Sequence, residues 1–166
     1  AFVGGVSYVA LKEAPATNLA ALAPLFPPSI VVNDAALQAK AAIIYDAKTG
    51  RVLYQKNASE SLPLASLTKL MTAHTVLSLA QPSTPVVLQA EDIRTEGDSG
   101  LRAGETFSLE ELITYGLVAS SNDAIAAAAA SLGPNYLEQM NNTASRLGLV
   151  HTRFFNPTGL DVTETT

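Results

Sequence analysis

Cysteine is absent from this sequence, and charged residues are few. The 166 residues include no Cys, 10 Lys or Arg and 15 Asp or Glu. Without cysteine the chain can form no disulfide, no thiolate nucleophile and no cysteine metal site. The net charge of −5 and the lack of any basic cluster argue against nucleic acid or an anionic membrane surface as partners.

Apolar side chains, in contrast, are plentiful. Hydrophobic residues make up 48% of the sequence and charged residues 15%, a combination that argues against disorder. A chain of 166 residues is also long enough for one ordinary domain with a real core. We therefore expect a folded domain.

Both ends of the sequence look cut. Residues 1–11 form an apolar run that is too short to span a bilayer and fits the remnant of a signal peptide or membrane anchor. A short buried strand or helix explains this run equally well. Residues 12–36 are rich in Ala and Pro and are expected to link this run to a domain at 37–166. Because the last residues carry no terminating signal, we expect a fragment.

The pattern of the central region predicts strands first and helices after them. The runs 41–46 and 51–55 are strand-like, and the turn residues 47–50 between them predict a β-hairpin. A short strand is expected at 86–88. Helices are expected over 66–80, 108–118, 124–132 and 135–147.

Capping signals and an apolar stripe refine these helices. Ser108 and Glu111 form a capping box at the start of the second helix. Asn122 and Asp123 are good N-cap types for the third. In the first helix one apolar stripe is formed by Leu67, Leu70, Met71, His74 and Leu77. Ala73 and Val76 extend the apolar surface around the side, so the helix is expected to be buried on most of its faces.

Ser66 and Lys69 stand at the start of the first predicted helix, three residues apart. At that spacing two helical side chains share a face, so the amine can lie against the hydroxyl. A lysine whose pKa is lowered can remove the serine proton and create a nucleophile. Taken alone the pair is weak evidence, because an N-cap serine beside a solvated lysine explains it as well.

Ser120 and Asn122 lie two apart at a break between two predicted helices. In a locally extended segment both side chains can point the same way. A hydroxyl and an amide there can hydrogen-bond a lysine amine and a substrate peptide group. An ordinary capping segment is the alternative explanation.

Together these motifs resemble a known family, the serine D-Ala-D-Ala carboxypeptidases or low-molecular-mass penicillin-binding proteins. The resemblance covers residues 37–161, and the Ser-x-x-Lys motif is one of this enzyme group's signatures. Order and spacing match in the hairpin 42–54, in 65–72 around Ser66, in Gly97-Asp98-Ser99, in Gly104-Glu105, in Ser120-Ser121-Asn122-Asp123-Ala124 and in Asn156-Pro157-Thr158-Gly159-Leu160.

The resemblance implies a fold and a set of roles. The fold is α/β (α+β), of the penicillin-binding protein/β-lactamase type, with an antiparallel sheet packed on helices and a helical subdomain at 108–147. Ser66 would be the nucleophile, Lys69 its general base and Ser120 a proton relay, while Asn122 would hold Lys69 and the substrate amide. The Ser66 N–H would be one oxyanion donor, and the other comes in this family from a later Lys-Thr-Gly strand that is missing here.

Other chemical signals are weaker. Lys48-Thr49-Gly50 spells the third family motif, but it precedes Ser66 and is better explained as the hairpin turn. His74 is expected at the edge of the core, facing away from Ser66. His151 has no partner at metal-ligand spacing, so neither a metal site nor a cofactor is expected.

The implied activity is removal of the terminal D-Ala from peptidoglycan stem peptides, outside the cytoplasm, with β-lactam antibiotics as acylating inhibitors. A β-lactamase and an endopeptidase that cuts cross-links share the motifs seen here, although the segment 156–159 favours the carboxypeptidase. A non-catalytic wall-binding module is the alternative from another class. Without the third motif, residues 1–166 alone are expected to be inactive.

Overall fold

The computed structural model describes residues 36–93 and 99–160. Of these, residues 36–60 belong to one compact unit and residues 61–160 to another. The apolar run at 1–11 and nearly all of the linker at 12–36 lie outside the described residues, so these predictions stay predictions. No helix in the part of the chain that is described is long and apolar enough to cross a membrane.

The first unit contains the predicted hairpin. Strands β1 (Ala42–Asp46) and β2 (Arg51–Lys56) pair antiparallel, with a bulge between Ile44 and Tyr45. The Asp46 carboxylate closes the turn by accepting hydrogen bonds from the N–H groups of Lys48 and Thr49 and from the Thr49 hydroxyl. Gly50 supplies the positive φ of +73° that the turn requires. Lys48-Thr49-Gly50 is therefore a hairpin turn, as the sequence predicts.

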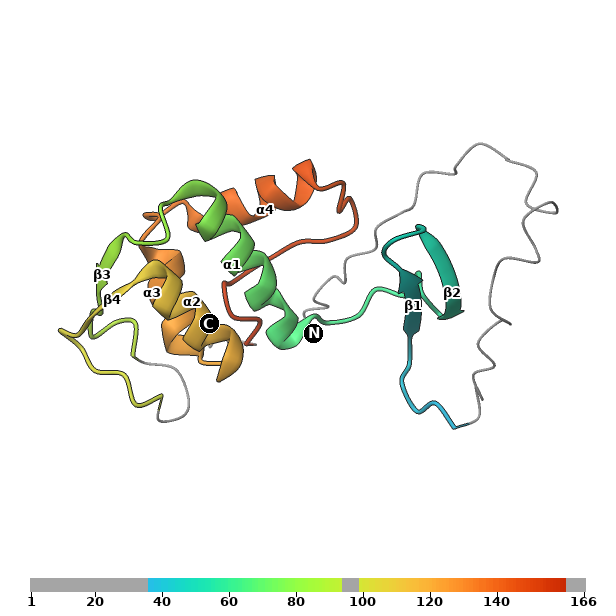
Figure 1. The fold of residues 1–166 in the computed structure, drawn as a ribbon, viewed down its shortest axis with the longest axis horizontal. Helices are drawn as coiled ribbons and strands as arrows, with labels where there is room; N and C mark the ends of the chain where they lie inside the picture. Colours follow the sequence, from blue (N-terminus) through green and yellow to red (C-terminus); the bar gives the residue numbers. More distant parts are fainter. Residues whose placement is uncertain (1–35, 94–98, 161–166) are drawn as a thin grey trace, which may run out of the picture. The chain divides into compact units, whose positions relative to one another are not determined.

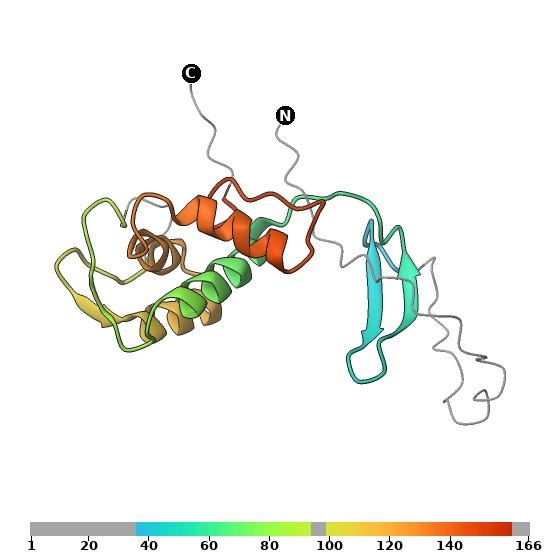
Figure 2. The ribbon, with the colours of Figure 1, turned by 90° about the horizontal axis from the view of Figure 1, so that it is seen from above.

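The second unit is mostly helical. A 3₁₀ turn, η3 (Ala65–Leu67), leads directly into α1 (Thr68–Leu79). Two short strands follow, β3 (Pro85–Val87) and β4 (Thr106–Ser108), and they pair antiparallel. The remaining helices are α2 (Leu109–Val118), α3 (Asn122–Ala130) and α4 (Tyr136–Arg146). Helix α1 contacts the other three, with α4 on one side and α2 and α3 on the other (Figures 1 and 2).

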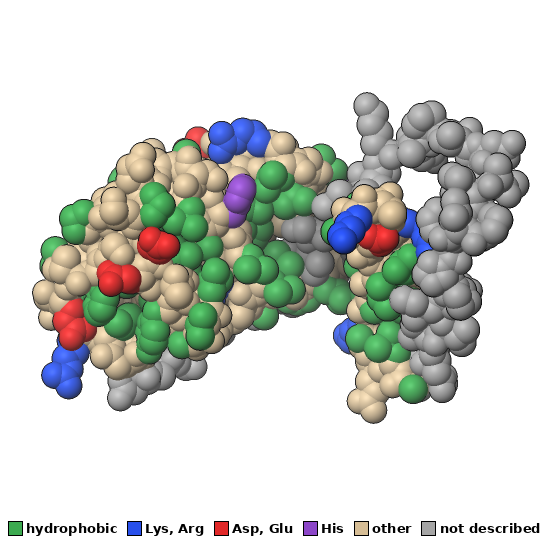
Figure 3. Space-filling model, viewed as in Figure 1, with side chains coloured by type: hydrophobic (Ala, Val, Ile, Leu, Met, Phe, Trp, Pro, Cys, Tyr) green, Lys and Arg blue, Asp and Glu red, His purple; other side chains and the backbone are tan. Residues whose placement is uncertain are grey.

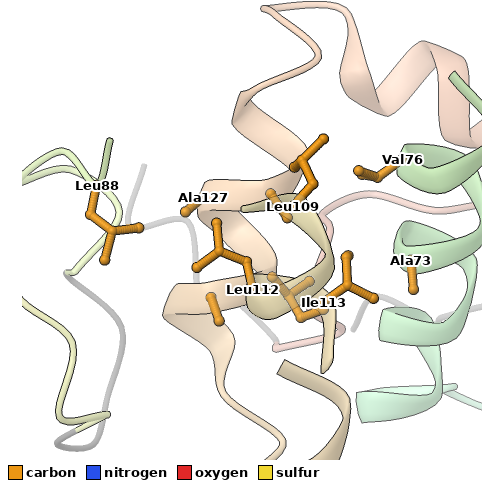
Figure 4. Packing of buried hydrophobic residues seen from close by; sticks show 10 residues of the cluster. Ala73, Val76, Leu88, Leu109, Leu112, Ile113 and Ala127 are labelled. Carbon is orange, nitrogen blue, oxygen red and sulfur yellow. The ribbon is translucent and has the colours of Figure 1, made fainter. Parts of the chain in front are cut away.

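Small side chains let these helices approach closely around one core. Ala73 and Val76 of α1 point toward Leu109 and Ile113 of α2, and Leu88 approaches from the segment after β3 (Figure 4). The alanines of α3, including the fully buried Ala124 and Ala128, add little bulk. A second cluster forms where α4 meets the segment after it, around Met140, Ala144 and Phe154.

Most of the predicted apolar stripe of α1 is exposed, whereas Ala73 and Val76 beside it are buried and Met71 packs partly buried against the second cluster. Leu70 is 57% exposed and Leu67 62%, while His74, placed at the edge of the core from the sequence, is exposed as well. The buried residues of α1 include Thr68, Lys69, Thr72, Ala73 and Val76. Periodicity fixes which residues share a face, but the choice of face depends on how closely the neighbours can pack. Here the smaller side chains face the helices, and Figure 3 shows hydrophobic side chains scattered over the surface in view.

The N-cap of α3 and the short strands β3 and β4 also differ from the prediction. The capping box of Ser108 and Glu111 is confirmed, but the N-cap of α3 is Ser121, whose hydroxyl accepts from the Ala124 N–H. Strand β4 was not predicted, because three residues between a polar loop and a helix cap carry no alternating pattern. Its partner β3 begins one residue before the strand expected at 86–88 and ends at Val87.

Candidate active site

The site is built around the junction between η3 and α1. Ser66 lies in the middle of the 3₁₀ turn and is exposed. The residue before it, Ala65, has a φ of +46°, an uncommon conformation for a residue with a side chain. Strained backbone of this kind gathers at functional sites when its surroundings hold it in place.

Lys69 points from the first turn of α1 to the Ser66 hydroxyl. Its Nζ donates to Ser66 Oγ at 2.9 Å, as the three-residue spacing predicts. The same Nζ lies 3.3 Å from Ser120 Oγ, and Ser120 Oγ lies 3.4 Å from Ser66 Oγ. One amine and two hydroxyls thus form a closed triangle of hydrogen bonds.

Burial favours the neutral form of the Lys69 amine, the form that can act as a base. Only 3% of this residue is exposed, and the loss of hydration lowers the pKa of its amine below the ordinary 10.5. Within residues 36–93 and 99–160 no carboxylate forms an ion pair with it, and the loss of hydration is the cause of the shift. The neutral amine can accept a proton from the hydroxyl beside it.

Ser120 reaches Lys69 from the break between α2 and α3. Its φ of +55° turns the chain sharply after α2 ends at Val118. Helices α2 and α3 pack so closely there that a Cβ added to Gly116 would lie 2.6 Å from Ile125 Cγ1. The helix pair therefore fixes the position of the Ser120 hydroxyl.

Asn122 is not part of this triangle. It is the first residue of α3 and is half-buried. In the described parts of the chain its side chain makes no hydrogen bond to Lys69. Its predicted role in holding Lys69 and a substrate amide stays a prediction.

Asp123 supports this region in a way that the sequence analysis missed. It is 2% exposed, and its Oδ2 accepts from Ser99 Oγ at 2.6 Å. The Tyr115 hydroxyl donates to the Ser99 carbonyl, so the loop at 99–101 is held by both α2 and α3. The only sequence signal for this role was an acidic residue at the start of a predicted helix, and such a residue by itself indicates only capping.

Among the residues that the structure describes, no three His, Asp or Glu side chains lie close enough to hold a metal ion. The described chemistry of the site rests on the amine, the two hydroxyls and the backbone N–H groups at the start of α1.

Comparison with known proteins places these features in a family. The family model described as D-alanyl-D-alanine carboxypeptidase matches residues 29–166. The D-alanyl-D-alanine carboxypeptidase DacF of Bacillus subtilis is 32% identical over 139 residues, which are 77% of this chain and 35% of that protein. A D-alanyl-D-alanine endopeptidase of Pseudomonas aeruginosa is 35% identical over 136 residues, 76% of this chain and 43% of that protein.

Solved structures share the fold. A D-alanyl-D-alanine carboxypeptidase from Mycobacterium tuberculosis has a TM-score of 0.71 and 29% identity, covering 75% of this chain and 48% of that one. Penicillin-binding protein D2 from Listeria monocytogenes, in an ampicillin-bound form, has a TM-score of 0.68 and 31% identity, covering 81% and 57%. The predicted α/β fold class is confirmed. The chain spans about a third to three fifths of the length of these proteins.

Proposed function

The chain belongs to the D-alanyl-D-alanine carboxypeptidase family, and on that basis we propose that it carries the acylating serine of a peptidoglycan peptidase. The substrate is the D-Ala-D-Ala end of a stem peptide, and the reaction releases the terminal D-Ala. The observation that carries this proposal is the triangle of Ser66, Lys69 and Ser120, with a buried amine 2.9 Å from an exposed hydroxyl.

The reaction has two stages. Ser66 Oγ attacks the carbonyl carbon of the penultimate D-Ala while the neutral Lys69 amine takes the hydroxyl proton. The proton passes through Ser120 to the nitrogen of the leaving D-Ala as the peptide bond breaks. Water then attacks the acyl-enzyme ester, giving up a proton to the same base, and Ser66 is restored.

Stabilisation of the oxyanion needs two N–H donors. The Ser66 N–H supplies one, since it lies in the 3₁₀ turn that leads into α1, and the first N–H groups of a helix are unpaired. The family's Lys-Thr-Gly strand supplies the other, and Lys48-Thr49-Gly50 cannot replace it because these residues close a hairpin. Asn122 binds the substrate amide from the first turn of α3.

The proposal includes a location and an inhibitor class. Stem peptides lie outside the cytoplasm, so the site works there, held by the apolar run at 1–11 or delivered by it as a signal peptide. β-Lactams acylate Ser66 as substrate mimics. Support comes from the ampicillin-bound state of the related Listeria protein.

A second activity has specific support. The relative from Pseudomonas aeruginosa is an endopeptidase and is 35% identical to this chain. An endopeptidase would use the same triangle but cut the D-Ala bond of a cross-linked dimer. The residues that contact the rest of the substrate, rather than the nucleophile, decide between the two activities.

The test uses the protein expressed from its complete reading frame. It is incubated separately with diacetyl-Lys-D-Ala-D-Ala, with a cross-linked muropeptide dimer and with benzylpenicillin, and a Ser66→Ala variant serves as the control. Release of D-Ala from the tripeptide identifies a carboxypeptidase, and cleavage of the dimer alone identifies an endopeptidase. Rapid repeated hydrolysis of penicillin indicates a β-lactamase. No reaction with any of the three would leave a non-catalytic wall-binding module.

A further inference from the structure

The segment 156–160 forms a tight turn that is held mainly by the side chain of Asn156. Asn156 Oδ1 accepts from the N–H of Thr158 at 3.0 Å and from the N–H of Gly159 at 2.6 Å. Asn156 Nδ2 donates to the Leu160 carbonyl at 2.8 Å. Pro157 and Thr158 are buried, so the turn is a packed element of the fold.

Gly159 touches the backbone directly before Ser66. A Cβ at this position would lie 1.8 Å from the Ala65 oxygen and 2.4 Å from the Ala65 carbonyl carbon. Non-bonded carbon and oxygen atoms do not approach so closely, so any side chain here would push the Ala65 carbonyl away by roughly 1 Å or more. The contact exists only because residue 159 is glycine.

The contacted group belongs to the same peptide unit as the Ser66 N–H. A peptide bond is planar, so the Ala65 oxygen and the Ser66 N–H turn together. The φ of +46° at Ala65 shows that this unit is held in an uncommon conformation. A rigid contact behind the carbonyl keeps the N–H on the opposite edge aimed in one direction.

A second contact joins the turn to α1. Thr72 is fully buried, and its Oγ1 donates to the Pro157 carbonyl at 2.6 Å. Thr72 lies three residues after Lys69 on the same helix face. The turn is therefore held against both the helix that carries Lys69 and the peptide that carries the Ser66 N–H.

We propose that the turn 156–160 is a positioning element for acyl transfer, with Gly159 setting the orientation of the Ser66 N–H in the oxyanion hole. This inference rests on the proposed function, because it assigns the turn to that reaction. The turn touches no substrate. It acts through the Ala65–Ser66 peptide, so its loss lowers the rate of acylation and leaves the preceding non-covalent binding step unchanged.

The first comparison pairs two glycines with the same backbone conformation. Gly159 has a φ of +75° and Gly148 a φ of +76°, but a Cβ on Gly148 would meet nothing within 4 Å. Gly148→Ala therefore reproduces the backbone strain without the clash. Both variants are made in the protein expressed from its complete reading frame, and stopped-flow labelling with a fluorescent penicillin separates the binding constant from the acylation rate constant.

We expect Gly159→Ala to lower the acylation rate constant by about ten- to a hundredfold, because a 1 Å misplacement at a reacting centre costs roughly that much. Gly148→Ala should stay within about twofold of wild type, and the binding constant should be unchanged in both. Measurements are made well below each variant's melting temperature, so that a loss of folded protein cannot imitate the effect.

The second comparison uses smaller changes in structure, and it tests the positioning role even if Gly159→Ala does not fold. Thr72→Val removes the hydroxyl that binds Pro157 with little change of shape, and Thr72→Ser keeps it. Loss of one such hydrogen bond should lower the acylation rate constant about fivefold in Thr72→Val, with recovery in Thr72→Ser.

The outcomes separate the two proposals. A wild-type protein that acylates, together with normal acylation rates in Gly159→Ala and Thr72→Val, overturns the positioning role and leaves the proposed function intact. Equal losses in Gly159→Ala and Gly148→Ala also overturn it, because strain alone would then explain the effect. A wild-type protein that is never acylated overturns the proposed function, and the positioning role falls with it.

Discussion

A single methyl group placed on Gly116 tests the packing that holds Ser120. Gly116 is buried in α2, and an added Cβ would lie 2.6 Å from Ile125 Cγ1 and 2.7 Å from Ile125 Cδ1. Ile125 belongs to α3 and is fully buried, so it has little room to move. Gly116→Ala therefore forces α2 and α3 apart or pushes Ile125 out of its rotamer.

Two opposing terms set the size of the effect. Replacing glycine by alanine inside a helix gains about 1 kcal/mol of helix propensity. Overpacking a buried site costs about 1–3 kcal/mol. The clash outweighs the propensity here, because both contacts are far inside van der Waals distance, and we expect a net loss of about 1–2 kcal/mol in the free energy of unfolding.

Denaturant unfolding in a double-mutant cycle isolates the clash. Ile125→Ala removes both offending atoms and should by itself destabilise the fold by about 2–5 kcal/mol. In that background the added methyl group finds space, so Gly116→Ala should be neutral or stabilising by up to about 1 kcal/mol. The coupling energy between the two sites should then be about 1–3 kcal/mol.

The same variant should impair the reaction, because Gly116 lies one turn before the break that carries Ser120. A shift of α2 moves the Ser120 hydroxyl away from Lys69 Nζ, now 3.3 Å away. Acylation should fall with stability in Gly116→Ala. A stabilised Gly116→Ala in the wild-type background, or a coupling energy near zero, would refute the reasoning.

Three further predictions concern Lys69 and the oxyanion hole. The rate of acylation should fall as the pH drops through the lowered pKa of Lys69. Lys69→Arg should abolish acylation, because a guanidinium stays protonated. A Lys69→Arg variant with a near wild-type rate would remove lysine from the mechanism. Burial lowers the pKa of Lys69 below 10.5, so the unfolded chain binds more protons than the folded one, and the stability contribution of Lys69 rises with pH between the lowered pKa and 10.5. Lys69→Met should accordingly be more stable than wild type at neutral pH, by a margin that shrinks toward pH 10.5 in denaturant titrations, and a margin independent of pH would contradict this origin. Residues 1–166 alone should fail to label with penicillin, because a missing oxyanion donor costs about 10²–10³ in rate. The product of the complete reading frame should label. Equal labelling of both proteins would show that no second donor is needed.

Local signals in the sequence predicted what depends on near neighbours. The hairpin turn at 47–50, the capping box of Ser108 and the approach of Lys69 to Ser66 all join residues within a few positions. Backbone geometry alone settles such contacts. The hydrogen bond from Lys69 to Ser120 spans 51 positions, and only the resemblance to a family brought these residues together in advance.

Packing between distant segments could not be predicted in this way. The periodicity of α1 gave a stripe but not its direction, and the leucines of that stripe are exposed. Two further contacts join distant segments that no local sequence signal pairs: the hydrogen bond between Asp123 and Ser99, and the contact of Gly159 with Ala65. A buried carboxylate and a glycine look ordinary in a sequence, because their roles come from the atoms that surround them.

The most direct test of the central claim is to locate the covalent bond. The product of the complete reading frame is incubated with benzylpenicillin, digested, and analysed by mass spectrometry, with Ser66→Ala as the matched control. The Ser66, Lys69 and Ser120 triangle predicts a penicilloyl group on the peptide that contains Ser66, and none in the variant. An adduct on another residue, or an adduct that persists in Ser66→Ala, would contradict the account.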